Sequence, residues 1–407
     1  MTRRRRDLVL LVLSVLFYWI GLYLYVPTLP TYIQTRTDSL ASVGVVLSMY
    51  GLLMGVLRLP VGIASDRLGR RKPFIVVGMA LVGIGAWAIG SSHSMQGLVW
   101  GRALTGIAAT TWVPMVVLFS GRFAASEAVR VTAMLTLVLN VGRILATSLT
   151  GWLNGIGGYP LAFYVASGAA AVGLLLILPV REDTPRAPKI TARQAIHLIR
   201  RSDVLLPAVL SAINLYADYA VTFGFMPILA EHLGAGDAIK SALVSSNLGM
   251  VAAGSLCAAL LVRRIGARSI LWTSITLLPI GMILAAGAPS LPWLFVSQLC
   301  FGFAAGTGYS VCMGMSIQYV DQKDRATAMG LHQAVYASGM FAGPWASGLI
   351  ADAIGIRPMF VLTAFACFIA SVALVRTLVR HSLHGASWRS QGESEPVPIR
   401  QQGGRRP

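Results

Sequence analysis

Long apolar stretches alternate with short polar segments along almost the whole chain. Each apolar stretch has about 20 residues, enough for a helix rising about 1.5 Å per residue to cross a hydrocarbon core of about 30 Å. The first stretch, 8–29, has no charge and is too long for a removed signal peptide, so we expect it to be retained. The pattern predicts an all-α integral membrane protein with twelve transmembrane helices, near 8–29, 42–62, 74–90, 97–119, 131–153, 161–180, 204–230, 241–262, 270–288, 292–318, 327–351 and 358–379.

The longest polar interruption of this pattern, 181–203, divides the chain into two predicted six-helix bundles, 1–180 and 204–379. Within it, Thr191 to Gln194 has the form of a capping box, and apolar residues follow at helical spacing. These features predict a cytosolic loop with a short amphipathic helix on the membrane surface. The end of the chain, 380–407, is rich in Ser, Gly, Gln, Pro and Arg and is predicted to be a disordered cytosolic tail.

The two halves repeat each other at an offset of 197 residues. Hydrophobicity alone does not align individual glycines, prolines and arginines, so the repeat predicts two pseudo-symmetric bundles that rock about a site between them. The corresponding pairs are Gly69 and Gly266, Gly158 and Gly355, Gly142 and Gly339, Gly151 and Gly348, Arg67 and Arg264, and Pro30 and Pro227.

Composition and charge support a membrane protein. Hydrophobic residues make up 56% of the 407 residues and charged ones 12%, about half the share usual in soluble domains. Of the 33 Lys and Arg, three lie in predicted spans (Arg58, Arg102, Arg143), three on the predicted outer side (Arg36, Lys240, Arg357), and 27 in or bordering segments on the side of the N-terminus. This bias predicts a multi-pass cell (inner) membrane protein with both termini cytosolic, and the scatter of the basic residues argues against nucleic-acid binding despite the net charge of +18.

The loop after the second span carries a dense motif, Gly62-Ile-Ala-Ser-Asp66-Arg67-Leu-Gly69-Arg70-Arg71-Lys72. Gly62 lets a neighbouring helix approach closely, and Gly69 permits a tight reversal. Asp66 is predicted at the cytosolic surface, where the positive dipole end of the eleventh span begins. The basic residues are suited to an anionic lipid surface.

This loop is similar, position for position, to the signature loop of the major facilitator superfamily, and the resemblance covers nearly the whole chain from Leu8 to Val379. It implies that family's fold and transport by alternating access, with the contact of Gly62 and Asp66 latching the outward-facing state. The alternative is that the basic loop only anchors the topology. In the second copy Ala259 and Arg263 replace the glycine and aspartate, so that copy is expected only to anchor.

Three weaker motifs also resemble the family. Arg102 to Gly106 matches its Arg-x-x-x-Gly element, and Arg102 is expected either to face a cavity or to snorkel to the outer surface. The fifth span lacks the proline and two glycines of the family's antiporter element and has Arg143 near mid-membrane instead. The eleventh keeps that pattern better, and its small residues are expected to pack against the second span; they are Gly339, Gly343, Pro344 and Gly348.

Asp218 is the one carboxylate predicted deep in the bilayer, which makes it the candidate proton-coupling group. Burial favours its neutral form and a nearby arginine its ionised form; the alternative is a permanent structural pair with an arginine. By resemblance, the first, fourth, seventh and tenth spans line a central cavity. The principal cavity candidates are Arg102, Arg143, Tyr23, Tyr216, Tyr219 and Gln298, with Tyr18, Tyr25, Trp112 and Tyr309 as further ones. His332 is assigned no function.

The favoured interpretation is a secondary active transporter of a small organic molecule, coupled to protons and exporting amphipathic compounds. The alternative within transport is uptake or exchange of an organic anion; a non-transporting receptor is a further alternative, and a membrane enzyme the weakest. No catalytic motif, cofactor fingerprint or metal-ligand spacing is present, and all four cysteines lie in predicted spans. We therefore expect no enzyme activity, cofactor or metal, with the lipid bilayer, a small-molecule substrate and protons as partners of a monomer.

Overall fold

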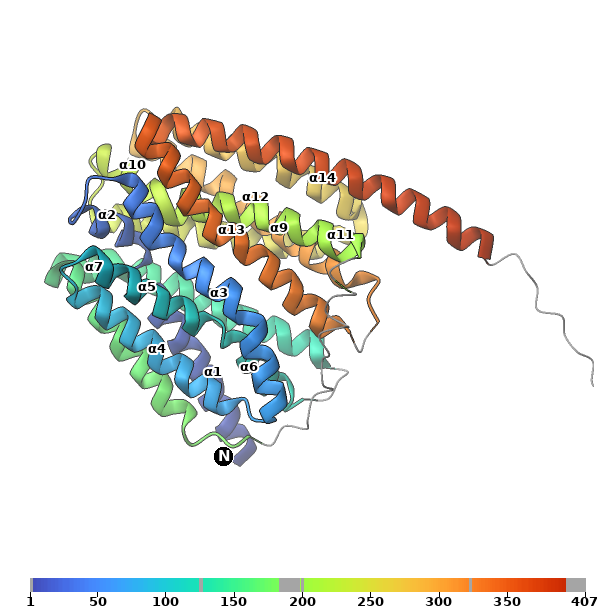
Figure 1. The fold of residues 1–407 in the computed structure, drawn as a ribbon, viewed down its shortest axis with the longest axis horizontal. Coiled ribbons are helices and arrows are strands. Elements are labelled where there is room, and N and C mark those ends of the chain that lie inside the picture. Colours follow the sequence, from blue (N-terminus) through green and yellow to red (C-terminus); the bar gives the residue numbers. More distant parts are fainter. Residues whose placement is uncertain (1–2, 124–126, 183–197, 199–200, 322–323, 393–407) are drawn as a thin grey trace, which may run out of the picture.

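The computed structural model describes residues 3–123, 127–182, 198, 201–321 and 324–392 (Figure 1). These residues are almost entirely helical, and no strand occurs among them. The first half contains α1 (Arg3–Tyr23), the 3₁₀ helix η1 (Val26–Thr28), α2 (Leu29–Gln34), α3 (Leu40–Leu68), α4 (Lys72–Ser91), α5 (Met95–Ala109), α6 (Trp112–Ser120) and α7 (Ala128–Ile177). The second half contains α9 (Ser202–Ala220), the π-helical segment η3 (Val221–Phe225), α10 (Met226–His232), α11 (Asp237–Ala286), α12 (Leu291–Gln318), α13 (Arg325–Ile354) and α14 (Ile356–Gly392).

Nine helical stretches of the described chain are long and apolar enough to cross a membrane. Two of them contain a glycine with non-helical backbone angles, at Gly157 and Gly158 in α7 and at Gly266 in α11. Dividing each at its break and adding α13, a 30-residue helix, accounts for twelve segments. The all-helical membrane fold is thus confirmed, whereas the number of twelve crossings stays a prediction.

The internal repeat is visible in the backbone. Of the five glycines with positive φ in the described residues, four form two pairs separated by 197 positions: Gly69 (φ 63°) with Gly266 (φ 80°), and Gly158 (φ 69°) with Gly355 (φ 89°). Each pair marks the same reversal between consecutive helices, a conformation that a side chain disfavours. The irregular segments η1 and η3 also fall at corresponding places, after the first and the seventh predicted spans have crossed most of their length.

The predicted central loop and the predicted disordered tail have different outcomes in the structure. The capping box at Thr191 to Gln194 and its predicted amphipathic helix fall among residues that the structure does not describe, as does 393–407. α14 continues to Gly392, so helix takes the place of the first part of the tail that was predicted to be disordered from 380. The bounds of the two bundles stay a prediction.

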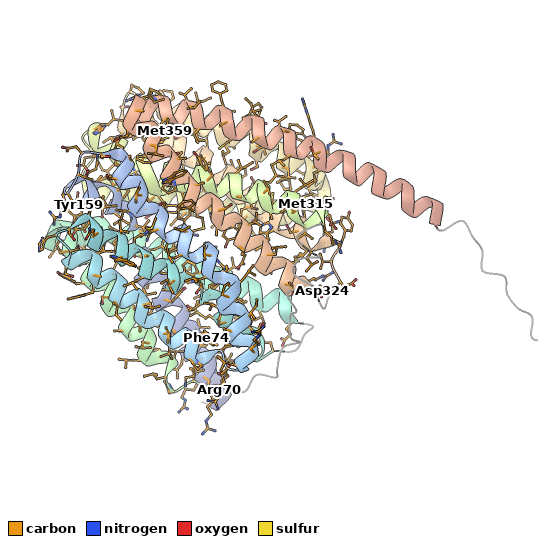
Figure 2. The ribbon with its side chains drawn as sticks, viewed as in Figure 1. Arg70, Phe74, Tyr159, Met315, Asp324 and Met359 are labelled. Carbon is orange, nitrogen blue, oxygen red and sulfur yellow. The ribbon has the colours of Figure 1, made fainter. Side chains whose placement is uncertain are left out.

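Figure 1 shows the first half, coloured blue to green, beside the second, coloured yellow to red, with α3 next to α13. α3 packs along α13 and α7 along α11, so these two pairs join the halves. Figure 2 shows Arg70 and Asp324 at the end of the molecule nearer the N-terminus, with Tyr159 and Met359 at the other. We call the former the basic end, with the loop at 69–71 and residues 319–321, and the latter the closed end, with the loops at 35–39 and 233–236.

At the closed end, polar contacts and close helix approaches bridge the two halves. Asp352 Oδ1 accepts hydrogen bonds from the backbone N–H groups of Leu40 (2.7 Å) and Ala41 (3.3 Å), in the first turn of α3. Asn154 Nδ2 donates to Asp237 Oδ2 at 2.8 Å, from α7 to α11. Lys240 Nζ, paired with Glu231 and Asp237, also donates to Thr31 Oγ1 at 3.2 Å. These bonds hold the halves together at the closed end.

Glycines bring the same helices together there. A Cβ atom on Gly44 or Gly151 would collide with the backbone of the other half, at Pro344 and Ala238 respectively. Midway along α3, a Cβ on Gly55 would lie 3.2 Å from Ala337 Cβ of α13. Toward the basic end, a Cβ on Gly62 would meet no atom within 4 Å. The helices are therefore tightly joined at the closed end and not at Gly62.

Candidate functional site

A connected set of aromatic and cationic side chains lies between the two halves. We define the central cluster as Tyr23 (end of α1), Tyr50 (α3), Arg102 (α5), Arg143 (α7), Tyr219 (α9) and Phe223 (η3). All belong to hydrophobic helices whose polar or aromatic positions turn inward, because a polar group facing lipid has no hydrogen-bond partner. Tyr219 and Phe223 are four residues apart, with ring centroids 5.1 Å apart.

The cluster forms a chain of ring and guanidinium contacts. The guanidinium of Arg102 lies 4.4 Å from the ring centroid of Tyr50, and that of Arg143 lies 4.4 Å from the ring centroid of Tyr23. The rings of Tyr50 and Tyr219 stack at 6.3 Å with an interplanar angle of 13°. The hydroxyls of Tyr23 and Tyr219 are 3.5 Å apart. A continuous path of contacts thus links Arg102 with Arg143, both in the first half, through Tyr219 of the second half.

The charges of these arginines are not balanced by ion pairs. Arg102 is 4% exposed, and neither it nor Arg143 has a carboxylate within 4 Å among the described residues. Arg102 Nε and Nη1 and Arg143 Nε are buried without hydrogen-bond partners. The negative faces of the tyrosine rings compensate part of each charge, by roughly 0.5–2 kcal/mol per contact. The guanidinium N–H groups keep unused donor capacity.

Asp218 lies beside the cluster, one residue before Tyr219 on α9, and is 8% exposed. Its Oδ1 atom has no hydrogen-bond partner. Arg143 is the cation that interacts with it electrostatically, although the two groups form no ion pair within 4 Å. Asp218 therefore has the positive charge of Arg143, from the other half of the chain, nearby but not in direct contact.

A small cavity adjoins the central cluster. Its lining is mostly aromatic or aliphatic, with Arg102 as the charged member; the lining residues are Leu22, Tyr23, Val26, Tyr50, Arg102, Tyr219 and Phe223. In this conformation the cavity is small, with room for about one water molecule. Residues of both halves contribute to it, so movement of one half against the other changes its shape.

A second set of polar and aromatic residues lies between α3, α12 and α13. The guanidinium of Arg58, 3% exposed, lies 5.9 Å from the ring centroid of Tyr336. The rings of Tyr309, His332 and Tyr336 contact one another at centroid distances of 5.8–6.5 Å. His332 Nδ1 and Ser316 Oγ are 2.6 Å apart. His332 is thus a hydrogen-bonded buried residue, and Arg58, like Arg102, is a buried arginine within an apolar helix.

Four of the six principal cavity candidates, Tyr23, Arg102, Arg143 and Tyr219, meet in the central cluster. Gln298 is fully buried beside it, where its Oε1 accepts a hydrogen bond from Thr222 Oγ1 at 3.1 Å. Tyr216 instead contacts α13, with its hydroxyl 3.3 Å from Ser347 Oγ. The sequence interpretation missed Tyr50, Phe223 and Arg58; the last carried the same signal as Arg102, an arginine within an apolar span.

The motif loop is tied to its own half. Arg71 is 1% exposed, and its Nη2 donates to Asp66 Oδ1 at 3.0 Å. The backbone N–H groups of Arg71 and Lys72 donate to the carboxylate of Glu182. Arg67 and Arg70 are exposed, and Gly69 makes the reversal. Asp66 therefore has a partner that does not belong to α13.

The motif glycines approach several helices. A Cβ on Gly106 would collide with the backbone of α3 at Tyr50. In α13, Gly339 and Gly343 approach the backbone of α9 at Ala212 and Tyr216, whereas Gly348 approaches α3 at Leu40 and Gly44. The expected partner of this helix was the second span. The difference arises because α13 lies between α3 and α9 and presents small residues to both.

The chain is similar in sequence to known membrane transporters. The family model described as Major Facilitator Superfamily matches residues 11–217 and 208–406. An MFS-type transporter, MJ1560, of Methanocaldococcus jannaschii is 20% identical over 373 residues, covering 87% of this chain and 93% of that protein. The inner membrane transport protein YajR of Escherichia coli is 37% identical over 100 residues, but that match spans 24% of this chain and 22% of YajR.

Solved structures show the same fold. A bacterial homologue of the human lysosomal transporter Spinster, in an inward-facing and occupied conformation, superposes with a TM-score of 0.79 at 16% identity, covering 93% of this chain and 97% of that chain. The nucleoside transporter NupG superposes with a TM-score of 0.73 at 15% identity, covering 93% and 99%.

Proposed function

The chain belongs to the Major Facilitator Superfamily, and from this premise we propose that it is a proton-coupled secondary transporter of a small organic molecule that works by alternating access. It is a multi-pass membrane protein and a transporter by family; coupling, direction and substrate are the parts that we propose. The observation that carries the proposal is the placement of Asp218 beside Arg143, at the junction of the two halves.

A carboxylate in this position can couple protons to movement. Burial favours the neutral acid, and the charge of Arg143 favours the carboxylate. Asp218 and Arg143 belong to different halves, so rocking of the bundles changes their separation and hence the balance between the two forms. Asp218 then takes up a proton in one conformation and releases it in the other.

The contacts between the halves support an assignment of the conformation. Bonds from Asp352, Asn154 and Lys240 bridge the closed end, and no atom lies within 4 Å of a Cβ placed on Gly62. We assign the structure to the state that faces the basic end. In the opposite state, we propose, Asp66 leaves Arg71 and binds the N-terminus of α13, which latches the basic end as the motif resemblance implies.

Relatives differ in what their names say they carry. They include multidrug resistance protein 1 of Bacillus subtilis, 23% identical over 45% of this chain, and the human organic anion transporter MFSD10, 18% identical over 92% of it. Export of amphipathic compounds and carriage of an organic anion are therefore both represented. The two arginines of the central cluster, of which Arg102 is buried, favour the second.

The test is accumulation by proteoliposomes containing Asp218→Asn, over a panel of amphiphiles and organic anions with and without a pH gradient. The variant is expected to bind substrate and support exchange but to lose accumulation driven by protons. The control is Asp203→Asn, which removes a carboxylate paired with Arg201 outside the cluster. Retained pH-driven accumulation in Asp218→Asn would show that another group carries the proton.

A further inference from the structure

We propose that the central cluster binds an organic anion, whose charged group is held by Arg102 and Arg143 and whose planar apolar part packs among the aromatic rings. The inference rests on the proposed function, because it takes the cavity beside the cluster as the substrate site, and it assigns the substrate's chemical class.

The balance of charge points to an anion. Three arginines, Arg58, Arg102 and Arg143, lie in the membrane-spanning core of the described chain, and one carboxylate, Asp218, lies near Arg143. None of the three arginines forms an ion pair within 4 Å. A cation at depth is expensive unless a counter-charge approaches it. An anionic ligand lowers this cost, whereas a cationic one raises it.

The hydrogen-bonding geometry points to a compact oxyanion. The guanidinium groups of Arg102 and Arg143 lie over the rings of Tyr50 and Tyr23, while Nε of both residues and Nη1 of Arg102 are buried donors without acceptors. A guanidinium held in this way presents its N–H edge to carboxylate, sulfonate or phosphate oxygens. Buried donors left unsatisfied are costly, so an acceptor group that reaches them stabilises the site.

The other residues that line the cavity indicate what the uncharged part of the ligand is. Tyr23, Tyr50, Tyr219 and Phe223 surround the cavity with rings, and Leu22 and Val26 add aliphatic surface. Such a lining favours a flat apolar group that stacks against or edges onto the rings. The two features together describe an aromatic or similarly planar organic anion.

The first experiment compares three ligands of one shape on the purified full chain in detergent, by isothermal titration calorimetry. The probes are 2-naphthoate, the neutral 2-naphthamide and the cationic 2-naphthylmethylammonium. We expect 2-naphthoate to bind roughly tenfold or more tightly than either of the others, because it alone supplies a charged acceptor. Equal affinity for the three, binding of none, or preference for the cation overturns the proposal.

The second experiment assigns the selectivity to residues. Arg102→Gln and Arg143→Gln are each expected to weaken 2-naphthoate binding roughly tenfold and to remove its advantage over 2-naphthamide. The control, Arg357→Gln, alters an arginine that donates to the carbonyls of Ala286 and Ala288 at the closed end, and it should bind like the wild type. Unchanged affinity and selectivity in both cluster variants overturns the assignment.

The wild-type comparison decides the proposal even where a variant does not fold. It also separates this inference from the proposed function, since binding in detergent requires neither flux nor a proton gradient. Selective binding of the anion without proton-driven accumulation refutes the coupling alone. Accumulation of uncharged or cationic compounds without anion selectivity refutes the anion site alone.

Discussion

Replacing Asp352 by Asn is expected to lower the population of the conformation in which the two halves are joined at the closed end. This carboxylate lies near the C-terminus of α13, and it accepts two backbone hydrogen bonds from the first turn of α3, in the other half. Asn has nearly the same shape but lacks the charge. The variant therefore weakens the bridge between the halves without removing side-chain volume.

The expected magnitude follows from the kind of contact. A carboxylate at an exposed helix N-terminus contributes about 0.3–1 kcal/mol. Asp352 is exposed, so the stabilisation of the closed end belongs in this range and not at the larger values found for buried pairs. At about 1.4 kcal/mol per tenfold change, the ratio of the two conformations shifts by about two- to fivefold.

The assay is a distance distribution between spin labels at His93 and Ser290, exposed loop residues at the closed end of the two halves. The four native cysteines are replaced for labelling. In Asp352→Asn the population with a long label-to-label distance should rise by the stated factor, and less so at high salt because the contact is exposed.

Asp38→Asn is the matched control. Asp38 is also exposed and lies two residues before α3, but it makes no hydrogen bond or ion pair with the other half in the described structure. Its loss changes the charge near the same helix terminus without breaking a bridge. Equal shifts in the two variants, or none in Asp352→Asn, would refute the reasoning that Asp352 holds the halves together.

Three further outcomes are expected. Gly339→Ala should lower the thermal stability of the purified protein, with a cost of about 1–3 kcal/mol, because its Cβ would collide with Ala212 O; Gly330→Ala in the same helix, where a Cβ meets nothing within 4 Å, should be near neutral. Asp66→Asn should reduce flux severalfold while membrane insertion, measured by expression and labelling, stays normal; wild-type flux would leave the loop only an anchor. In intact cells, a cysteine at position 236 should react with an impermeant maleimide and one at position 190 should not, and the reverse pattern would contradict the predicted topology.

The fold followed from the sequence because two independent signals agreed. The apolar stretches gave helices of the right length, and the 197-residue offset paired glycines that have the same unusual φ in the structure, such as Gly69 with Gly266. The observed helices differ from the predicted ones where local backbone conformation sets the end of a helix. The segment η3 contains Gly224 and lies just before Pro227, but the hydropathy of the seventh span is continuous and did not indicate a break there. The reversal within α11 depends on Gly266 alone, between basic residues.

The candidate site was harder to predict because side-chain direction is not encoded in a uniformly apolar helix. Amphipathic periodicity distinguishes a wet face from a core face, but lipid and protein interior are both apolar. Tyr216 and Tyr219 are three residues apart and were given the same role, yet the first contacts Ser347 and the second joins the central cluster. Charged residues were more informative, since burial at depth restricts where Arg102 and Arg143 can point.

The irregular segments η1 and η3 change the mechanics of the molecule. Each separates a long helix from a short one nearer the closed end, α1 from α2 and α9 from α10, and the two short helices contact each other. A break of this kind localises bending, because the backbone hydrogen bonds that stiffen a helix are rearranged there. The pair α2 and α10 can therefore tilt over the cavity while α1 and α9 stay in register with their neighbours. Trapping a ligand then requires less motion than reorienting a whole half.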